Sequence, residues 1–166
     1  MEGLLPEEQA GYEEYRAKVA GTNISEQTLL ATDYLNHFNE IVMLLDMLPD
    51  MPEMIEECKA WQPKTYAEHF ADSTFSDRQL AIEAYERVPS RYRRPFEETI
   101  SQINTLILGS IARLDTDIAA GIDGEALRHT CQSLSRAAQA LMDCASAIIH
   151  GSDRAMDQFE IDGLIG

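Results

Sequence analysis

The sequence has few of the features that mark several common classes of protein. It contains three cysteines, Cys58, Cys131 and Cys144, and no Cys-x-x-Cys pair, so it indicates neither a disulfide framework nor a zinc site. No apolar run reaches the length of about 18 to 20 residues that crosses a bilayer. The chain begins with an acidic segment in place of a basic stretch followed by an apolar one, so we expect no targeting segment and a cytoplasmic protein.

Basic side chains are also scarce. Lys and Arg number 13 against 29 Asp and Glu in 166 residues, which gives a net charge of −16. A polyphosphate backbone or an anionic membrane surface would repel such a chain, so we expect neither a nucleic-acid partner nor a membrane partner. Hydrophobic residues make up 45% of the chain, enough for the core of one globular domain, which excludes a chain that is disordered throughout.

Strand patterns are missing, and apolar residues recur near the helical period in almost every long segment. This pattern predicts an all-α helical bundle. We expect helices over about 6–19, 25–48, 52–61, 76–88, 95–120 and 125–149, with 64–74 ambiguous. The last two are long and joined by a short turn, which predicts an antiparallel helical hairpin. We therefore divide the chain into a helical bundle domain, 1–151, and a C-terminal tail, 152–166; the bundle closes within one chain or as a homodimer.

Candidate metal ligands do not form a recognisable site. Di-iron bundles use Glu-x-x-His pairs on two helices, whereas this chain has His37-x-x-Glu40 once and the adjacent pair Glu68 and His69, which cannot share one helix face. We expect these histidines to be structural or exposed and the protein to hold no metal of its own.

The tail has an amphipathic pattern. If residues 156–166 formed a short helix, Ile161, Leu164 and Ile165 would share one face and Phe159 would extend it. A detached peptide of this size cannot hold itself folded, so its apolar face predicts a groove that receives it, either on a partner or on its own bundle.

The run D-Q-F-E-I-D-G-L-I, residues 157–165, resembles a short motif of bacterial chemotaxis, roughly S-Q-x-E-I-D-x-L-L. With this motif the flagellar switch protein FliM and, in looser form, the C-terminus of the chemotaxis phosphatase CheZ bind the phosphorylated response regulator CheY. The resemblance implies that the tail binds a CheY-like response regulator. The residues implied in partner binding are Gln158, Phe159, Glu160, Ile161, Asp162, Leu164 and Ile165.

A second segment resembles the CheZ-type phosphatases, which carry an Asp-x-x-x-Gln pair on a long bundle helix in a context like F-Q-D-L-T-G-Q-V. Residues 96–103 read F-E-E-T-I-S-Q-I, so Gln102 matches the glutamine and Glu98 stands where the family has Asp. No other acidic residue of this chain is followed four residues later by Gln or Asn. The resemblance implies a protein phosphatase, a hydrolase of two-component signalling, with Gln102 and Glu98 as its catalytic residues.

The implied chemistry has a clear physical basis. A response regulator supplies the phosphorylated aspartate, a lysine and Mg²⁺, so this chain would need no cofactor of its own. What hydrolysis lacks is a water held in line with the scissile bond, and Gln102 would orient it. Glu98, one helical turn earlier, could pair with the regulator's lysine. Arg93 and Arg94, part of the single basic cluster of the sequence, could meet the acidic rim around the regulator's Mg²⁺.

Other readings stay open. The same tail could belong to a non-catalytic receiver-binding adaptor. The segment at His129 resembles the H-x-L-K-G-x-S motif of histidine phosphotransfer proteins, although Gln132 and Ser133 replace its lysine and glycine. Asp33-x-x-Asn36 also carries an acid and an amide of the types that dephosphorylate receivers in other families. Each alternative is still a protein of two-component signalling.

Overall fold

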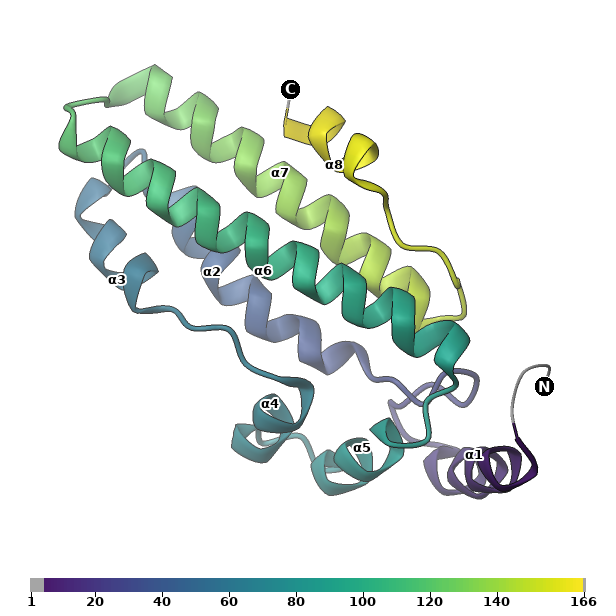
Figure 1. The fold of residues 1–166 in the computed structure, drawn as a ribbon. Coiled ribbons are helices and arrows are strands. Elements are labelled where there is room, and N and C mark those ends of the chain that lie inside the picture. Colours follow the sequence, from purple (N-terminus) through teal and green to yellow (C-terminus); the bar gives the residue numbers. More distant parts are fainter. Residues whose placement is uncertain (1–4, 166) are drawn as a thin grey trace.

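The computed structural model describes residues 5–165, and within them the chain forms eight α-helices and two short 3-10 turns without a named strand. In chain order these are α1 (Pro6–Val19), η1 (Thr32–Leu35), α2 (Asn36–Met47), η2 (Pro52–Met54), α3 (Ile55–Ala60), α4 (Tyr66–Asp72), α5 (Arg78–Tyr85), α6 (Ser90–Ala119), α7 (Gly124–Ile149) and α8 (Gln158–Ile165). The predicted all-α bundle is confirmed (Figure 1).

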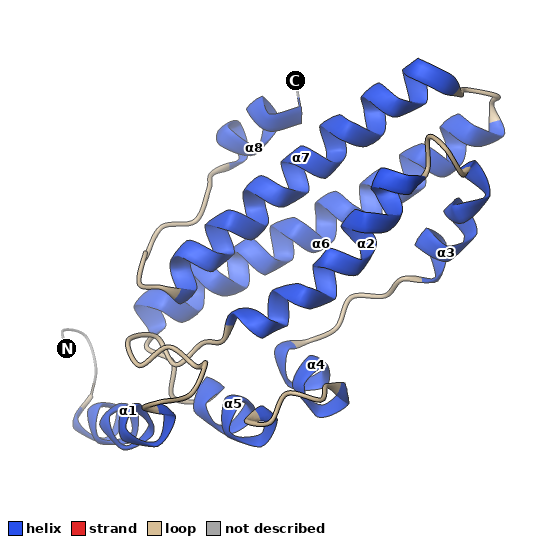
Figure 2. Ribbon diagram, turned by 180° about the vertical axis from the view of Figure 1, so that it is seen from behind, coloured by secondary structure: helices blue, strands red, loops and turns tan. Residues whose placement is uncertain are grey.

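Three helices form the body of the molecule. α6 and α7 run antiparallel as the predicted hairpin, and α2 lies along them as a third helix (Figures 1 and 2). The hairpin turn contains Gly121, whose φ of +86° is a left-handed conformation that glycine adopts without steric cost. On α7 the apolar residues at helical spacing are all buried: Leu127, Cys131, Leu134, Ala138, Leu141 and Ala145.

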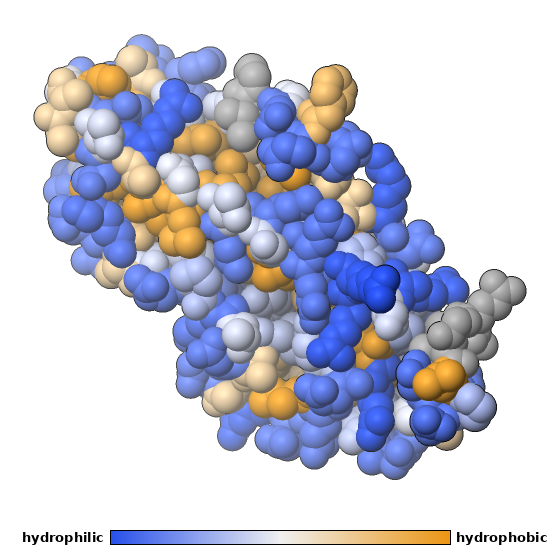
Figure 3. Space-filling model, in the orientation of Figure 1, coloured by the Kyte–Doolittle hydropathy of each residue, from blue (hydrophilic) through white to orange (hydrophobic). Residues whose placement is uncertain are grey.

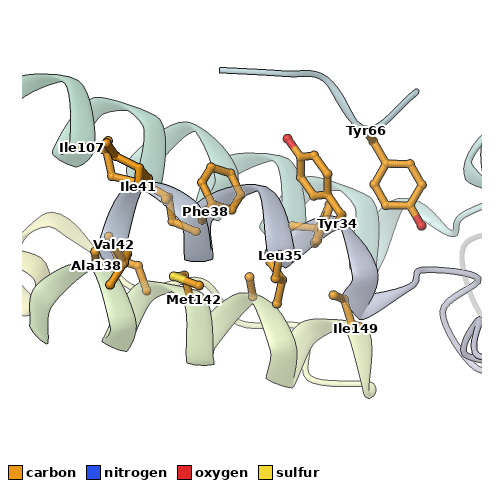
Figure 4. Close-up of a cluster of buried hydrophobic side chains, with 14 of the residues drawn as sticks. Tyr34, Leu35, Phe38, Ile41, Val42, Tyr66, Ile107, Ala138, Met142 and Ile149 are labelled. Carbon is orange, nitrogen blue, oxygen red and sulfur yellow. The ribbon is translucent and has the colours of Figure 1, made fainter. Parts of the chain in front are cut away.

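The core lies between these three helices. Figure 4 shows Phe38 and Ile41 of α2 facing Ile107 of α6 and Met142 of α7. Phe38 is fully buried, with its ring 5.6 Å from the ring of Tyr34 in an edge-on arrangement. Burying aromatic side chains of this size contributes more to stability than any exposed contact of the molecule.

The short helices α4 and α5 lie with α1 at one end of the bundle (Figure 1). The ambiguous segment 64–74 is helical because Thr65 and Glu68 form a capping box: each side chain accepts a hydrogen bond from the backbone N–H of the other residue, at 3.1 and 2.8 Å. The Tyr66 hydroxyl accepts a hydrogen bond from the Ala31 N–H at 2.9 Å, which ties this end to the loop before α2.

The second helix begins later than the sequence predicts. Ser25 caps a turn instead of a helix, since its hydroxyl accepts from the backbone N–H groups of Gln27 and Thr28. Leu29 then takes a left-handed φ of 66°, and the buried Thr28 hydroxyl donates to the carbonyl of Ile149 at 2.6 Å. This long-range bond holds residues 25–31 as a loop, so α2 starts only at Asn36.

The sixth helix begins earlier than the sequence predicts. The expected break before Pro95 is absent, and α6 starts at Ser90, directly after Pro89. Pro95 removes one intrahelical hydrogen bond in the second turn, but the fully buried Tyr92 anchors the turn before it. Arg93 and Arg94 therefore lie in the opening turns of α6 and not in a loop.

Candidate functional site

The candidate site lies on the outward face of α6. The helical period places Phe96, Ile103 and Ile107 in the core and leaves Glu98 exposed, with Gln102 at the border between core and surface. Glu98 lies one turn before Gln102 on the same side of the helix. No hydrogen bond or ion pair with another described residue engages the Glu98 carboxylate. The spacing predicted from the sequence therefore sets an acid and an amide side by side.

The carboxamide of Gln102 contacts the C-terminal tail. Its Nε2 donates a hydrogen bond to the backbone carbonyl of Met156 at 2.8 Å. Its Oε1 is buried and has no hydrogen-bond partner among the described residues. Among the described residues the tail therefore engages the amide nitrogen of Gln102 and leaves its oxygen without a protein partner.

The tail folds back along α7 and ends in the short helix α8 (Figure 1). The chain leaves α7 at Gly151, whose φ is +118° and whose Cβ, if present, would lie 2.6 Å from Oε1 of Gln27. Only glycine fits this exit. In this structure the groove that receives the tail lies on its own bundle. Ile161 is buried there, with 5% of its surface exposed.

Asp157 and Glu160 form a capping pair at the N-terminus of helix α8. The Asp157 carboxylate accepts from the Glu160 N–H at 2.8 Å, and Glu160 accepts from the Asp157 N–H at 3.4 Å. Arg154 adds an ion pair with Glu160 at 2.6 Å, and Gln158 donates to Asp162 at 2.8 Å. The polar residues of the motif are thus engaged within the tail. The D-x-x-E spacing of Asp157 and Glu160 is typical of a capping pair and could have predicted this from the sequence.

Of the apolar residues expected on one face of the tail, Phe159 lies off that face. Ile161 points into the bundle and Leu164 is half-buried, whereas Phe159 is 87% exposed and does not extend that face. The side chain of Ile165 lies outside the described residues. Phe159 is therefore accessible to a partner, whereas Ile161 is buried against the bundle.

Two cavities flank the exposed ridge of α6 formed by Ser101 and Thr105. On one side, a cavity of about 260 Å³ is lined by Gln102 and Leu106 together with Gln158 and Ile161 of the tail. On the other side, a cavity of about 380 Å³ is lined by residues of α4, α5 and α6. The second cavity includes Asn104, whose Oδ1 is likewise buried without a partner among residues 5–164.

The segment of α6 between the two cavities contains no charged residue. Residues 99–112 contain no Asp, Glu, Lys or Arg, in a chain in which 25% of residues are charged. Leu108, on the same stretch, is 44% exposed. Figure 3 shows apolar and neutral side chains over the middle of α6 among otherwise hydrophilic surface.

The basic cluster divides into engaged and free side chains. Arg93 pairs with Glu97 at 3.0 Å and lies over the ring of Tyr85, whose hydroxyl donates to Glu97 at 2.7 Å. Partial burial opposes ionisation of Glu97, but the hydrogen bonds from Tyr85 and Arg93 outweigh it and lower its pKa. Arg94 is exposed, and no ion pair with a described residue holds it. Arg94 is the better placed of the two predicted partner contacts.

The residues of the alternative readings lie away from this face. His129 is exposed in the first turns of α7. Asp33 is bonded to His69 at 3.0 Å and accepts from Asn36 at 3.2 Å, at the edge of a polar groove of about 620 Å³. In the Asp33 and Asn36 pair, the Asp33 carboxylate is thus already hydrogen-bonded to two neighbours.

The two buried thiols, Cys58 and Cys131, are poor nucleophiles, and the buried His37 is a poor base. Burial raises the pKa of Cys58 and that of Cys131 to about 11. Burial also lowers the pKa of His37 to about 4, and its Nε2 accepts a hydrogen bond from the Lys64 N–H at 3.1 Å. These groups stay neutral at pH 7 and pack in the core.

Within residues 5–165 no cluster of three or more His, Cys, Asp or Glu is arranged to bind a metal ion. None of the helices described combines the length and the apolarity that a membrane crossing requires. Comparison of the chain with models of protein families, with curated proteins and with solved structures found no match. What the chain does must therefore be inferred from its own residues.

Proposed function

We propose that this protein is a phosphatase that acts on a CheY-like response regulator, with Gln102 orienting the hydrolytic water and the tail binding the regulator. One observation carries the proposal. The two segments singled out by separate sequence motifs, 54 residues apart at the Gln102–Met156 contact, lie against each other on one face of the molecule. A regulator held by the tail would therefore be close to Gln102.

The chemistry asked of Gln102 is small. In-line attack on an aspartyl phosphate needs a water whose lone pair points at phosphorus, and an amide oxygen achieves this by accepting a hydrogen bond from that water. Oε1 of Gln102 is the atom required, and it has no partner among the described residues. The regulator supplies its own Mg²⁺ and lysine, so this chain contributes orientation alone.

The charges around Gln102 favour docking of an acidic partner. A net charge of −16 repels another acidic protein at most of the surface, but the face at residues 99–112 carries no charge. At its N-terminal end Arg94, which has no ion pair with a residue of 5–165, would offer its positive charge to the carboxylates that hold the regulator's Mg²⁺. Glu98 would offer a carboxylate to the regulator's lysine.

A non-catalytic adaptor is the second candidate. The observation that favours it is the cover over Gln102, since an amide bonded to Met156 is not presented to a partner. An adaptor would bind the regulator through the tail and leave its rate of dephosphorylation unchanged. A homodimer would be compatible with both candidates, so it does not separate them.

A single assay separates the two functions. A CheY-type receiver domain is phosphorylated with acetyl phosphate and Mg²⁺, and its dephosphorylation is followed with and without this protein. We expect Gln102→Ala to lower the stimulated rate about 100-fold while binding persists, because the water loses its positioning group. Asn104→Ala is the matched control, since it removes an equivalent amide that lines the other cavity.

The outcomes are exclusive. If the wild-type protein binds the receiver and leaves its dephosphorylation rate unchanged, the protein is an adaptor. If ³²P label moves from the receiver to this chain and is lost in His129→Gln, the protein is a phosphotransfer relay. If no binding is measured, the tail motif has no receiver-binding role.

A further inference from the structure

The tail and Gln102 occlude each other. The Met156 carbonyl holds the amide at 2.8 Å, and Gln158 and Ile161 close the cavity that Gln102 and Leu106 line. Ile161 has 5% of its surface exposed, so a partner cannot contact it while α8 stays docked. Each of the two elements needed for the proposed function is thus unavailable in this arrangement.

We infer that α8 is an intramolecular cover over Gln102, and that the phosphorylated receiver removes it by binding the tail. This inference rests on the proposed function and names its regulation. One side chain cannot be buried in two places, so docking of Ile161 on the bundle and its binding by a receiver are mutually exclusive. Release of the tail exposes Gln102 and frees the peptide in the same step.

The contacts of the tail suit a cover that opens. Ile161 is the single fully buried residue of 152–164, and Phe159 next to it is 87% exposed. The ion pair of Glu160 is with Arg154 of the same segment, so release breaks no charge pair with the bundle. Release of the tail also breaks the bond from Gln102 Nε2 to the Met156 carbonyl and exposes the whole amide to solvent.

Phe159 gives the receiver a first contact. Its exposed ring lies on the same eight-residue helix as the buried Ile161, so a receiver can engage the tail before α8 has left the bundle. A helix of this length is not stable alone in water, so α8 would leave the surface of the bundle only as it binds the surface of the receiver. The apparent affinity of the tail for the receiver is then its intrinsic affinity reduced by the fraction of molecules in which the tail is released.

Substitution on the bundle side tests this without altering the tail. Leu106→Asp places a carboxylate in the cavity that Ile161 closes, and Met43→Asp places the same charge at an exposed apolar position of α2, outside residues 99–112. We expect backbone amides of 158–165 to be protected from hydrogen exchange in the wild-type protein and in Met43→Asp, and to lose that protection in Leu106→Asp. Thr105→Glu, at an exposed position that lines both cavities, repeats the test without altering a buried residue.

Receiver binding supplies the second measurement. The probe is a CheY-type receiver domain activated with beryllofluoride, titrated against each full-length variant. We expect Leu106→Asp and Thr105→Glu to bind it at least about fivefold more tightly than the wild-type protein and Met43→Asp, because the cost of undocking is gone. The added carboxylates would by themselves repel an acidic receiver, so their charge does not explain tighter binding.

Each failure has its own signature. If the amides of 158–165 exchange freely in the wild-type protein, or if all variants bind the receiver equally, the cover is refuted while a loss of rate in Gln102→Ala would still support the phosphatase. If the amides are protected but no variant binds the receiver, the proposed function fails and the regulatory inference fails with it.

Discussion

Helices α2 and α6 and the C-terminal tail all pack on α7, but the two helices bury far more apolar surface there than the tail does. Between α2, α6 and α7 the core buries many large side chains, including Phe38, Ile41 and Ile107. The tail contributes one buried apolar residue, Ile161, and a few hydrogen bonds with the bundle, among them those that the Met156 carbonyl accepts from Gln102 and the Arg154 carbonyl accepts from Cys144. The body is thus expected to open only on global unfolding, and the tail by local release.

This difference places the candidate function at the boundary between the two regions. A group that must meet a partner has to lie where the structure opens at low cost, and a group that must be aimed has to sit on a rigid element. Gln102 satisfies both conditions, since its backbone belongs to the long helix α6 and its side chain lies under the tail.

The largest expected effect is on the body. Phe38→Ala should lower the free energy of unfolding by about 3–5 kcal/mol, because it leaves a cavity among fully buried rings. The matched change in the tail, Phe159→Ala, should alter it by less than about 0.5 kcal/mol, since that ring is 87% exposed. Urea unfolding followed by circular dichroism measures both values, and equal losses would contradict the contrast between the regions.

Acidification should also weaken the body selectively. Burial lowers the pKa of His37 from 6.5 to about 4, so below pH 6.5 the unfolded chain binds a proton that the folded chain still refuses. Stability contributed by neutral His37 is present above pH 6.5 and is lost as the pH falls towards 4, with a total of roughly 3 kcal/mol.

The control for this pH effect is His37→Gln, which cannot take up that proton. The unfolding free energies of the two proteins should converge or cross as the pH falls from 7 to 4 in urea titrations. A constant difference across that range would mean that His37 is accessible to protons in the folded state. The tail 152–166 contains no histidine, so this effect belongs to the body alone.

Only a small global effect is expected at the buried residue of the tail. Ile161→Ala should lower the free energy of unfolding by less than about 1 kcal/mol, because its loss is limited to the free energy of docking the tail. Ile107→Ala removes the same side chain from the body and should cost about 2–5 kcal/mol. Should Ile161→Ala cost as much as Ile107→Ala in urea unfolding, the tail would belong to the cooperative core.

Local patterns predicted the hairpin correctly. The apolar residues of α6 and α7 recur at spacings of three and four, and Asp123 and Gly124 mark the turn, so both helices and their antiparallel packing follow from neighbours in sequence. The pairing of Glu98 with Gln102 on one face likewise follows from helical geometry. These features depend on residues close together in the chain.

The wrong predictions concern long-range contacts. Ser25 is a good helix cap by itself, but the bond from Thr28 to Ile149 holds the following residues as a loop. Pro95 is a good break signal, but the buried Tyr92 keeps the helix going through it. In both cases tertiary packing outweighs a local preference of about 1–3 kcal/mol.

The sequence by itself determined that this protein is helical and which residues of each helix are apolar, and it predicted Gln102 and the tail as the candidate functional residues. Only the tertiary structure decided that the tail lies over Gln102 and that Ile161, not Phe159, is the side chain it buries. The reason is physical: periodicity shows that a face must be covered, while the surface that covers it comes from a distant part of the chain.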